Sequence, residues 1–477
     1  MSSTAQATAD VRGAQDTKAF ACVLIGIAVA IITYFLPLGL NEVTRRVMAV
    51  SVFVLLMWMT EAIPLAVAGL LGCWAYWVLA GIPVTKVFSG FTNDSPWFIL
   101  GAILLGLMAD VTGFAKRLAY NIVLRVGTKY SHILIGMMVV NFLLTFIIPS
   151  SVAKTALVCA ISIGLIQSYG LGKGSNIGRA LILVMTFEAG VFDKVIMAGA
   201  GSILSRGLIE QLGHVPVSYG LWFVAYLPIT ILTIVSGWLG ALWLFPAEKK
   251  SLEGGEAYCR AELAKMGPMK APEIRATIIL GLAVLLWATD HWHHISPSKI
   301  GIVAGLTACL PKVGAIRKED FQKANFPIVL FIGTAICMGN VVASTDILNI
   351  VTGAIFRWMS PLLQSGSIFT APILYWYCNL FHLFLADLSI LTATVPPLMA
   401  FSLKNHFSPL SLGMMWCFAV GGKFFIYQQG AQAVGYAFGY FTAKDFFKFG
   451  VLFFIAESIC LLIFVPWYWP LLGLSLH

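Results

Sequence analysis

The chain has 477 residues, of which 59% are hydrophobic and only 11% carry a charged side chain. A soluble domain has roughly 25% charged residues. So few charges exclude a water-soluble surface at this length, and lipid must surround most of the chain. The formal net charge of +9 fits the excess of Lys and Arg in cytoplasmic loops, not nucleic-acid binding. The cysteines are scattered singly without metal spacing, and no cofactor is indicated.

The first nineteen residues are predicted to form a short, polar, cytoplasmic N-terminus. The apolar run over 20–38 can cross a bilayer at about 1.5 Å per residue. Because it lacks a small-residue cleavage motif, we interpret it as a retained helix and not a signal peptide. Eleven simple spans are predicted in all, at residues 20–38, 47–63, 65–82, 96–112, 179–207, 217–246, 275–290, 297–313, 327–344, 412–438 and 447–473.

Two further apolar stretches have a polar centre and are not predicted as simple spans. Residues 132–168 are interrupted by Pro149-Ser150-Ser151, and residues 368–402 are interrupted around Ala386 to Ser389. Two short helical legs around a polar centre are typical of re-entrant hairpins. Such irregular backbone is tolerated in a membrane where it lines a cavity, as in transporters.

Lysine and arginine predict the orientation, because cytoplasmic loops are enriched in them. With the N-terminus inside, all the larger basic clusters fall in the cytoplasm, although Arg45 and Arg46 fall outside. We therefore predict a multi-pass inner (plasma) membrane protein with a cytoplasmic N-terminus and a periplasmic C-terminus. The cytoplasmic clusters are Arg12 and Lys18; Lys116, Arg117, Arg125 and Lys129; Lys249, Lys250, Arg260, Lys265, Lys270 and Arg275; and Lys312, Arg317, Lys318 and Lys323.

A weak internal repeat relates the two halves of the chain. The matched positions are Gly101 with Gly333, 232 residues later, and Gly190 and Gly199-Ala200 with Gly421 and Gly430-Ala431, 231 residues later. Since the halves enter the membrane from opposite sides in the predicted topology, the repeat is inverted, which is a transporter architecture. We expect a first half over 20–246, a cytoplasmic loop over 247–275, and a second half over 276–477.

The first candidate site follows the break at Pro149. A helix that begins there leaves free N–H groups, and Ser150 or Ser151 suits its N-cap. The positive end of the helix attracts a carboxylate or a sulfonate, and Lys154 adds a full charge at membrane depth. We predict that Ser150, Ser151, Lys154 and Thr155 bind substrate. The alternative for Lys154 is that it snorkels or pairs with a structural acid.

The second candidate site is the corresponding break in the second half. Ser389 and Thr392 supply hydroxyls for substrate, and Asp387 supplies a carboxylate that could bind a cation or carry a proton. The alternative for Asp387 is a helix N-cap without a transport role. The nearby His382 is interpreted as a structural residue.

Glycine-rich interruptions mark the predicted spans 179–207 and 412–438. Glycine lets a helix unwind and exposes carbonyl oxygens that can hold Na⁺; close helix packing through small residues is the alternative. Asp193 and Lys194 either neutralise each other or lie at an interface. The predicted ion-coupling residues are Ser150, Gly199, Asp387 and Gly430, and Gln428 and Gln432 are added to the substrate-binding set.

The chain resembles the divalent anion/sodium symporter family, of the solute carrier 13 type. The residues that carry the resemblance are Trp58-Met-Thr-Glu-Ala-Ile-Pro64, Leu65-Ala-Val-Ala-Gly-Leu-Leu71, Phe88-Ser-Gly-Phe91, Gly101-Ala-Ile-Leu-Leu-Gly106 and Thr112-Gly-Phe-Ala-Lys-Arg117. The resemblance implies a homodimer of elevator transporters, each with a scaffold part and a moving transport part. It also implies di- or tricarboxylate substrates, usually with Na⁺.

The hairpin tips depart from the family pattern. In the family each tip carries Ser-Asn-Thr, which contacts the substrate and helps to frame a Na⁺ site. Here the first tip reads Ser150-Ser151-Val152 and the second reads approximately Ala386-Asp387-Leu388. These changes favour another small anion, such as a sulfonate or a monocarboxylate, with proton coupling through Asp387 or exchange without a cation.

The sequence therefore predicts an all-α polytopic membrane protein, with about eleven transmembrane helices and two re-entrant hairpins in two inverted repeats. Its predicted function is secondary active transport of small organic anions by an elevator mechanism, coupled to Na⁺ or H⁺ or by exchange. One alternative is an inorganic-ion or Na⁺/H⁺ antiporter of the same superfamily. The other is a membrane-embedded enzyme, for which the His291, His293 and His294 cluster is the candidate metal site.

Overall fold

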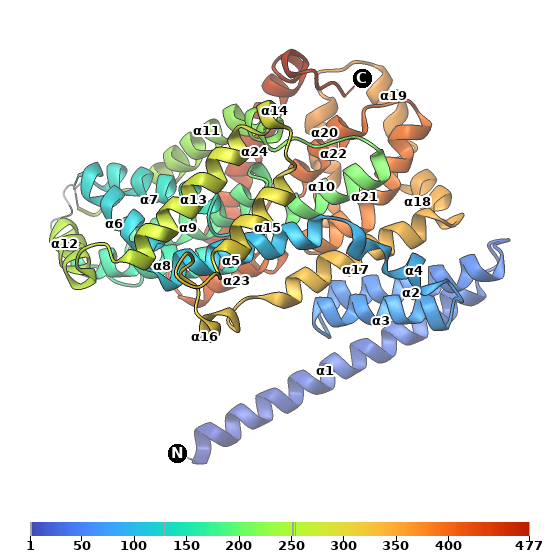
Figure 1. Ribbon diagram of the computed structural model, residues 1–477, viewed down its shortest axis with the longest axis horizontal. Helices are drawn as coiled ribbons and strands as arrows, with labels where there is room; N and C mark the ends of the chain where they lie inside the picture. The colour runs from blue at the N-terminus through green and yellow to red at the C-terminus, as the bar shows by residue number, and fades with distance from the viewer. Residues whose placement is uncertain (1, 128, 250–251, 253, 477) are drawn as a thin grey trace.

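The computed structural model describes residues 2–127, 129–249, 252 and 254–476, and the side chains of residues 16 onward within them. The described residues form helices and no strands (Figure 1). This confirms the all-helical class that was predicted from hydropathy. Of the predicted basic clusters, Lys250 and the side chain of Arg12 lie outside the described part of the chain.

Most helices of the first half fall within the predicted apolar runs, but the first helix begins at Ser2, within the stretch predicted as a polar N-terminus, and residues 84–92 and 114–126 form helices that were not predicted. The helices of the first half are α1 (Ser2–Phe35), α2 (Glu42–Thr60), α3 (Leu65–Val78), α4 (Val84–Val87), η1 (Phe88–Thr92), α5 (Ser95–Val111), α6 (Phe114–Val126), α7 (Tyr130–Thr145), α8 (Ser151–Ser168), α9 (Asn176–Val195), α10 (Ala200–Gly213) and α11 (Tyr219–Leu244). Side-chain N-caps begin several of them. Asn41, Ser150, Ser175 and Ser218 each accept a hydrogen bond from a backbone N–H three residues later, which satisfies a donor that the helix leaves unpaired.

The second half continues in the same way. Its helices are α12 (Gly255–Met266), α13 (Ala271–Ala288), α14 (Asp290–His293), α15 (Pro297–Thr307), α16 (Lys318–Phe321), α17 (Phe326–Ala343), α18 (Ile347–Phe356), α19 (Met359–Gln364), α20 (Thr370–Phe381), α21 (Asp387–Lys404), α22 (Pro409–Ala419), η2 (Ile426–Gln428), α23 (Gly430–Ala437), α24 (Ala443–Trp467) and η3 (Trp469–Leu472). The expected loop 247–275 contains α12, and α18 and α19 lie in a stretch for which no helix was predicted.

Fewer helices are long enough to cross a membrane than the eleven spans predicted. Within the described residues, seven helices meet the length and hydropathy required, or eight if the pair Val84–Thr92 and Ser95–Val111, bent by 42°, counts as one span. The predicted spans 179–207 and 412–438 are each divided into two shorter helices. A polytopic membrane protein is confirmed, and the count of eleven stays a prediction.

Helices from one half of the chain pack against helices from the other. α3 lies against α17, α5 against α15, α10 against α21, and α11 against α24. The α5–α15 approach is close enough that a Cβ on Gly101 would lie 2.2 Å from the carbonyl oxygen of Gly301. The long α1 packs on α2 at the edge of the molecule (Figure 1). The halves are therefore interleaved in space.

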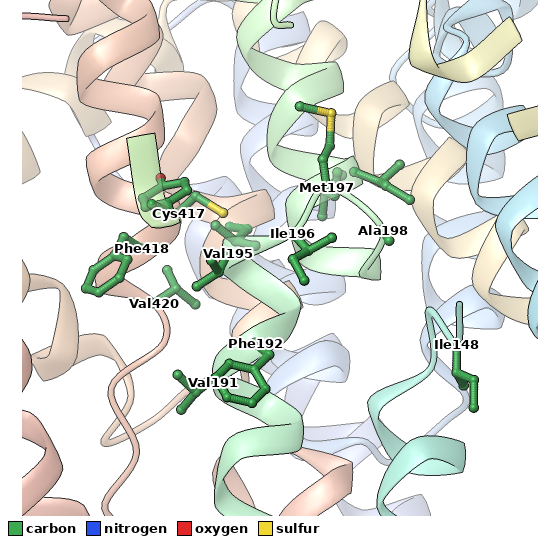
Figure 2. Close-up of a cluster of buried hydrophobic side chains, with 14 of the residues drawn as sticks. Ile148, Val191, Phe192, Val195, Ile196, Met197, Ala198, Cys417, Phe418 and Val420 are labelled. Carbon is green, nitrogen blue, oxygen red and sulfur yellow. The ribbon is translucent and has the colours of Figure 1, made fainter. Parts of the chain in front are cut away.

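Breaks in helices bring polar backbone into the interior. The chain leaves the helical path between α7 and α8, between α9 and α10, between α20 and α21, and between α22 and α23. Figure 2 shows the apolar packing around two of these breaks, where Val195 and Ile196 at the end of α9 lie near Cys417 and Phe418 of α22. This packing places the ends of α9 and α22 next to each other at the centre of the molecule.

Candidate functional site

A cavity of about 680 Å³ lies where the helix breaks meet. Its lining includes the first residues of α8, α10, α21 and α23. The N-terminus of an α-helix carries unpaired N–H groups and a partial positive charge of about half an elementary charge. The convergence of these N-termini on one cavity favours a bound anion.

The tip before α8 presents serine side chains at its helix end. Ser150 is the N-cap of α8, and its Oγ accepts a hydrogen bond from the N–H of Ala153 at 3.3 Å. Ser150, Ser151 and Val152 all line the cavity. The Ser151 Oγ also accepts a 3.5 Å hydrogen bond from the side-chain amide of Gln429, just before α23, so the two helix ends share one wall of the cavity.

The tip before α21 is different because its first residue is acidic. The Asp387 carboxylate lines the cavity and accepts a 2.7 Å hydrogen bond from the Lys423 ammonium. An acidic side chain in the first turn uses part of the favourable field of the helix end. The α21 tip therefore differs from the α8 tip in carrying a carboxylate that is paired with Lys423. The predicted alternative that Asp387 is the N-cap is wrong, because Ala386 occupies that position.

Lys154 is buried behind the first tip and does not line the cavity. Its side chain is completely buried, and its ammonium donates to Thr145 Oγ1 at 2.7 Å and to Asp193 Oδ1 at 3.0 Å. This is the alternative in which Lys154 pairs with an acid. Its charge is balanced by Asp193, which is among the residues that line the cavity.

Lys194 pairs with a different acid from its neighbour Asp193. Its ammonium lies 3.2 Å from Glu457 of α24 and donates to the carbonyl oxygen of Phe418 at 3.2 Å. Glu457 also accepts a hydrogen bond from the Tyr375 hydroxyl of α20. The hypothesis that Asp193 and Lys194 neutralise each other is therefore wrong, because the helix directs consecutive side chains to different neighbours.

The predicted site residues divide between the cavity wall and the interior behind it. Those that line the cavity are Ser150, Ser151, Asp387, Ser389, Gln428 and Gly430, and those that do not are Lys154, Thr155, Gly199, Thr392 and Gln432. Thr392 donates to the carbonyl oxygen of Leu388 within its own helix. The residues behind the wall can therefore act only by holding the wall in place or through their charge.

The glutamines near the second break have separate roles. Gln428 Oε1 accepts from the N–H groups of Phe424 and Phe425, and its amide nitrogen donates to the carbonyl oxygen of His382. These contacts use the amide of Gln428 to hold the unwound backbone. Gln429, which was not predicted, lines the cavity and is the glutamine whose amide faces Ser151.

Among the described residues, the histidines show no arrangement that would hold a metal. His382 is completely buried, and its Nε2 lies 2.6 Å from the carbonyl oxygen of Val420, consistent with a structural role. His293 contacts the backbone of Leu286 and Ile295. In the part of the chain that the structure describes, no group of three or more His, Cys, Asp or Glu residues could hold a metal ion.

Sequence reasoning did not select Gln429, Glu188, Lys423 or Glu457, of which Gln429 lines the cavity and the other three are buried charged residues. Glu188 is completely buried, and neither of its carboxylate oxygens has a hydrogen-bond partner among the described residues. The available signal was a charged side chain within an apolar run, since such residues are costly in a membrane and mark a site. Glu457, inside the 25-residue apolar helix α24, carries that signal most clearly.

Comparison with known proteins gives matches along nearly the whole chain. Residues 17–475 match the family model described as sodium:sulfate symporter transmembrane region. A membrane protein of Cupriavidus necator is 26% identical, over 92% of this chain and 89% of its own length. A sodium-dependent dicarboxylate transporter of Staphylococcus saprophyticus is 23% identical, over 79% of this chain and 77% of its own length. A citrate/succinate antiporter of Escherichia coli is 22% identical, over 81% of this chain and 80% of its own length.

Proposed function

Because the chain belongs to the sodium:sulfate symporter family, we propose that it carries small carboxylate anions across the membrane as a secondary transporter. Its relatives are named as dicarboxylate and citrate/succinate transporters. The observation that carries the proposal is the convergence of the N-termini of α8, α10, α21 and α23 on one cavity. The cavity volume lies within the range of about 300–1,000 Å³ that is usual for small-molecule sites.

We place the anion against the α8 tip. Its oxygens would accept hydrogen bonds from the free N–H groups at the start of α8 and from the hydroxyls of Ser150 and Ser151. The Gln429 amide would contact it from the same wall, and Ser389 would contact it from the α21 side. Lys154 and Thr155 would support the tip from behind, and Asp387 would leave the second tip less suited to a second carboxylate.

A thermal-shift screen of the purified full chain tests this function. Acetate, succinate, citrate and ethanesulfonate would be compared, each as a choline and as a sodium salt. Succinate or citrate should raise the melting temperature in at least one salt, because a ligand that binds only the folded state stabilises it. Stabilisation by cations alone would favour the alternative of an inorganic-ion or Na⁺/H⁺ antiporter. Chemical conversion of the bound anion would favour an enzyme.

We infer that the cavity opens toward the cytoplasm. Glu61, Asp110 and Lys323 are among its lining residues, and Asp110 and Lys323 are close in sequence to the basic clusters that follow α5 and α15. In Figure 1, α12 and α16 lie toward one side of the molecule, while α14 and the C-terminus lie toward the other. We infer a state open to the cytoplasm, with the C-terminus on the periplasmic side of the inner membrane.

An ion-pair network joins α10 to the residue before α5 and to the start of α15, on the side that this proposal assigns to the periplasm. Arg206 of α10 donates to both carboxylate oxygens of Asp94, each at 3.2 Å, pairs with Glu210 at 2.8 Å, and donates to Ser298 at the start of α15. In an elevator, α10 would move with the transport part while Asp94 and Ser298 would stay with the scaffold. The network would then hold only the cytoplasm-facing state.

Asp94→Asn should shift the protein toward the outward-facing state, because it removes the carboxylate that pairs with Arg206 between the transport part and the scaffold. The measurement is labelling of a cysteine at position 152, in a background without native cysteines, by an impermeant maleimide added from the periplasmic side. Labelling should become several-fold faster. Glu256→Gln, which removes an exposed ion pair within α12, is the control. Equal labelling rates in both variants would contradict a moving α10.

The remaining architecture follows from the same proposal. The re-entrant hairpins would be α7–α8 and α20–α21, the two inverted repeats would lie in residues 20–246 and 276–477, and the cytoplasmic loop would be 247–275. The protein would work as a homodimer, as the family resemblance implies. Cross-linking in native membranes at the lipid-facing side of α1, α2 and α3 would test the dimer.

A further inference from the structure

The name of the family implies that Na⁺ is a coupling ion. Whether Na⁺ would fit in this chain depends on the oxygen atoms at the two tips. Sodium sites in transporters are formed by carbonyl, hydroxyl and carboxylate oxygens at breaks in helices. In this chain, oxygens of these kinds at both hairpin tips are already bonded to lysine ammonium groups. The residues present at these two positions therefore do not fit a bound Na⁺.

The first ammonium joins the α7–α8 tip to the break after α9. Lys154 Nζ donates to Thr145 Oγ1, at the end of α7, and to Asp193 Oδ1, two residues before α9 ends. The lysine side chain is completely buried. A monovalent cation is thus already held by a hydroxyl and a carboxylate, at a point where a coupling cation would link the tip to the broken helix.

The second ammonium joins the α20–α21 tip to the break after α22. Lys423 Nζ donates to Asp387 Oδ1 at 2.7 Å and to the carbonyl oxygen of Val420 at 2.8 Å, and Lys423 is 1% exposed. Here the acid lies on the tip and the lysine lies in the break. In the first pair the lysine lies on the tip helix and the acid on the broken helix. The same lysine–aspartate ion pair therefore occurs at both tips, with the positions of the lysine and the aspartate exchanged.

We propose that the ammonium groups of Lys154 and Lys423 take the places of coupling Na⁺ ions, so that carboxylate binding and transport proceed without Na⁺. The inference rests on the transport function proposed above. An added Na⁺ would compete with a tethered ammonium for the same oxygens, and it would bring a second positive charge to a pair that is already neutral.

This substitution determines what can drive transport. A side chain stays with the protein and is not released on the other side, so it cannot draw on a Na⁺ gradient. Uphill movement of one carboxylate then needs another driver, and counterflow of a second anion is one that requires no cation. The structure therefore points to exchange of one carboxylate for another.

The decisive experiment is exchange by the full-length protein in liposomes loaded with unlabelled succinate. Uptake of labelled succinate would be measured in sodium chloride and in choline chloride. The two initial rates should agree within about twofold, which corresponds to a difference of less than half a kcal/mol. Saturable stimulation by Na⁺ well beyond that factor would overturn the inference.

Lysine variants test the role of the ammonium groups directly. Lys154→Met and Lys423→Met keep the length of the side chain but leave Asp193 or Asp387 without its lysine, close to the anion. Each should weaken succinate binding by about tenfold or more in choline buffer. Lys404→Met, at the exposed end of α21, is the matched control. Binding by either site variant with wild-type affinity would overturn the inference.

The outcomes separate this inference from the proposed function. If no carboxylate binds in either salt, the proposed function fails. If succinate binds and exchanges only when Na⁺ is present, the function stands and this inference fails. If a methionine variant does not fold, the comparison of the two salts with the wild-type protein still decides.

Discussion

Ser151→Trp should abolish succinate binding and transport while the protein still folds. Ser151 lies at the start of α8 on the wall of the cavity, in contact with Gln429. An indole at this position would extend into the space assigned to the anion and cover the free N–H groups of the helix. The loss of affinity should exceed about a hundredfold, or about 2.7 kcal/mol.

Isothermal titration with succinate and size-exclusion chromatography would check this result together. Leu239→Trp is a suitable control, since Leu239 is a half-exposed side chain on α11 that is expected to face lipid. It should bind as wild type. If Ser151→Trp also binds succinate normally, the anion does not lie at the α8 tip, and the site must be sought elsewhere in the cavity.

Lys194→Met should destabilise the folded protein by about 3–5 kcal/mol, because it leaves the buried Glu457 carboxylate without its counter-charge. Glu457 is 1% exposed and would retain only its hydrogen bond from Tyr375 among the described contacts. The ammonium of Lys194 also lies 4.1 Å from the centroid of the Phe418 ring. Thermal unfolding of the purified protein in detergent would show a clear fall in melting temperature.

The double variant Lys194→Met, Glu457→Gln should recover part of this loss, since it removes the charge that was left unpaired. Lys265→Met, which breaks an exposed pair with Glu262 on α12, should leave the melting temperature unchanged. If Lys194→Met melts at the wild-type temperature, the Lys194–Glu457 pair does not hold α9 and α24 together. The double variant also shows whether Tyr375 can bond an amide as well as a carboxylate.

The helical, membrane-embedded class and the positions of the breaks could be predicted from the sequence. Hydropathy over about 20 residues indicates whether a segment prefers lipid. The membrane-embedded class and the positions of the breaks are therefore both properties of short stretches of chain. Proline and serine at 149–151 predicted the start of α8 for the same reason, because N-capping is decided within one helical turn. The family resemblance, carried by local motifs such as 58–64, is confirmed by the match over residues 17–475.

The partners of the buried charges were decided only by the tertiary structure. Lys194 and Glu457 are 263 residues apart, and Lys154 and Asp193 are 39 apart. Which acid a lysine meets depends on how each helix is rotated about its axis and which helices pack together, and a single sequence contains no local signal for either. For that reason Lys154 was expected to contact the anion, whereas it lies behind the tip.

The tertiary structure also decided which of the predicted residues line the cavity and which lie behind its wall. The sequence alone determined that the chain lies in lipid as a series of helices, with polar tips at 149–151 and 386–389, because these features follow from composition and local backbone chemistry. Only the packing of α9, α10, α22 and α23 against those tips decided that Gln429 faces the cavity while Gln432 does not. It also decided that Lys154 and Lys423 fill the oxygen-lined positions at the breaks, since those positions exist only where segments distant in the chain meet.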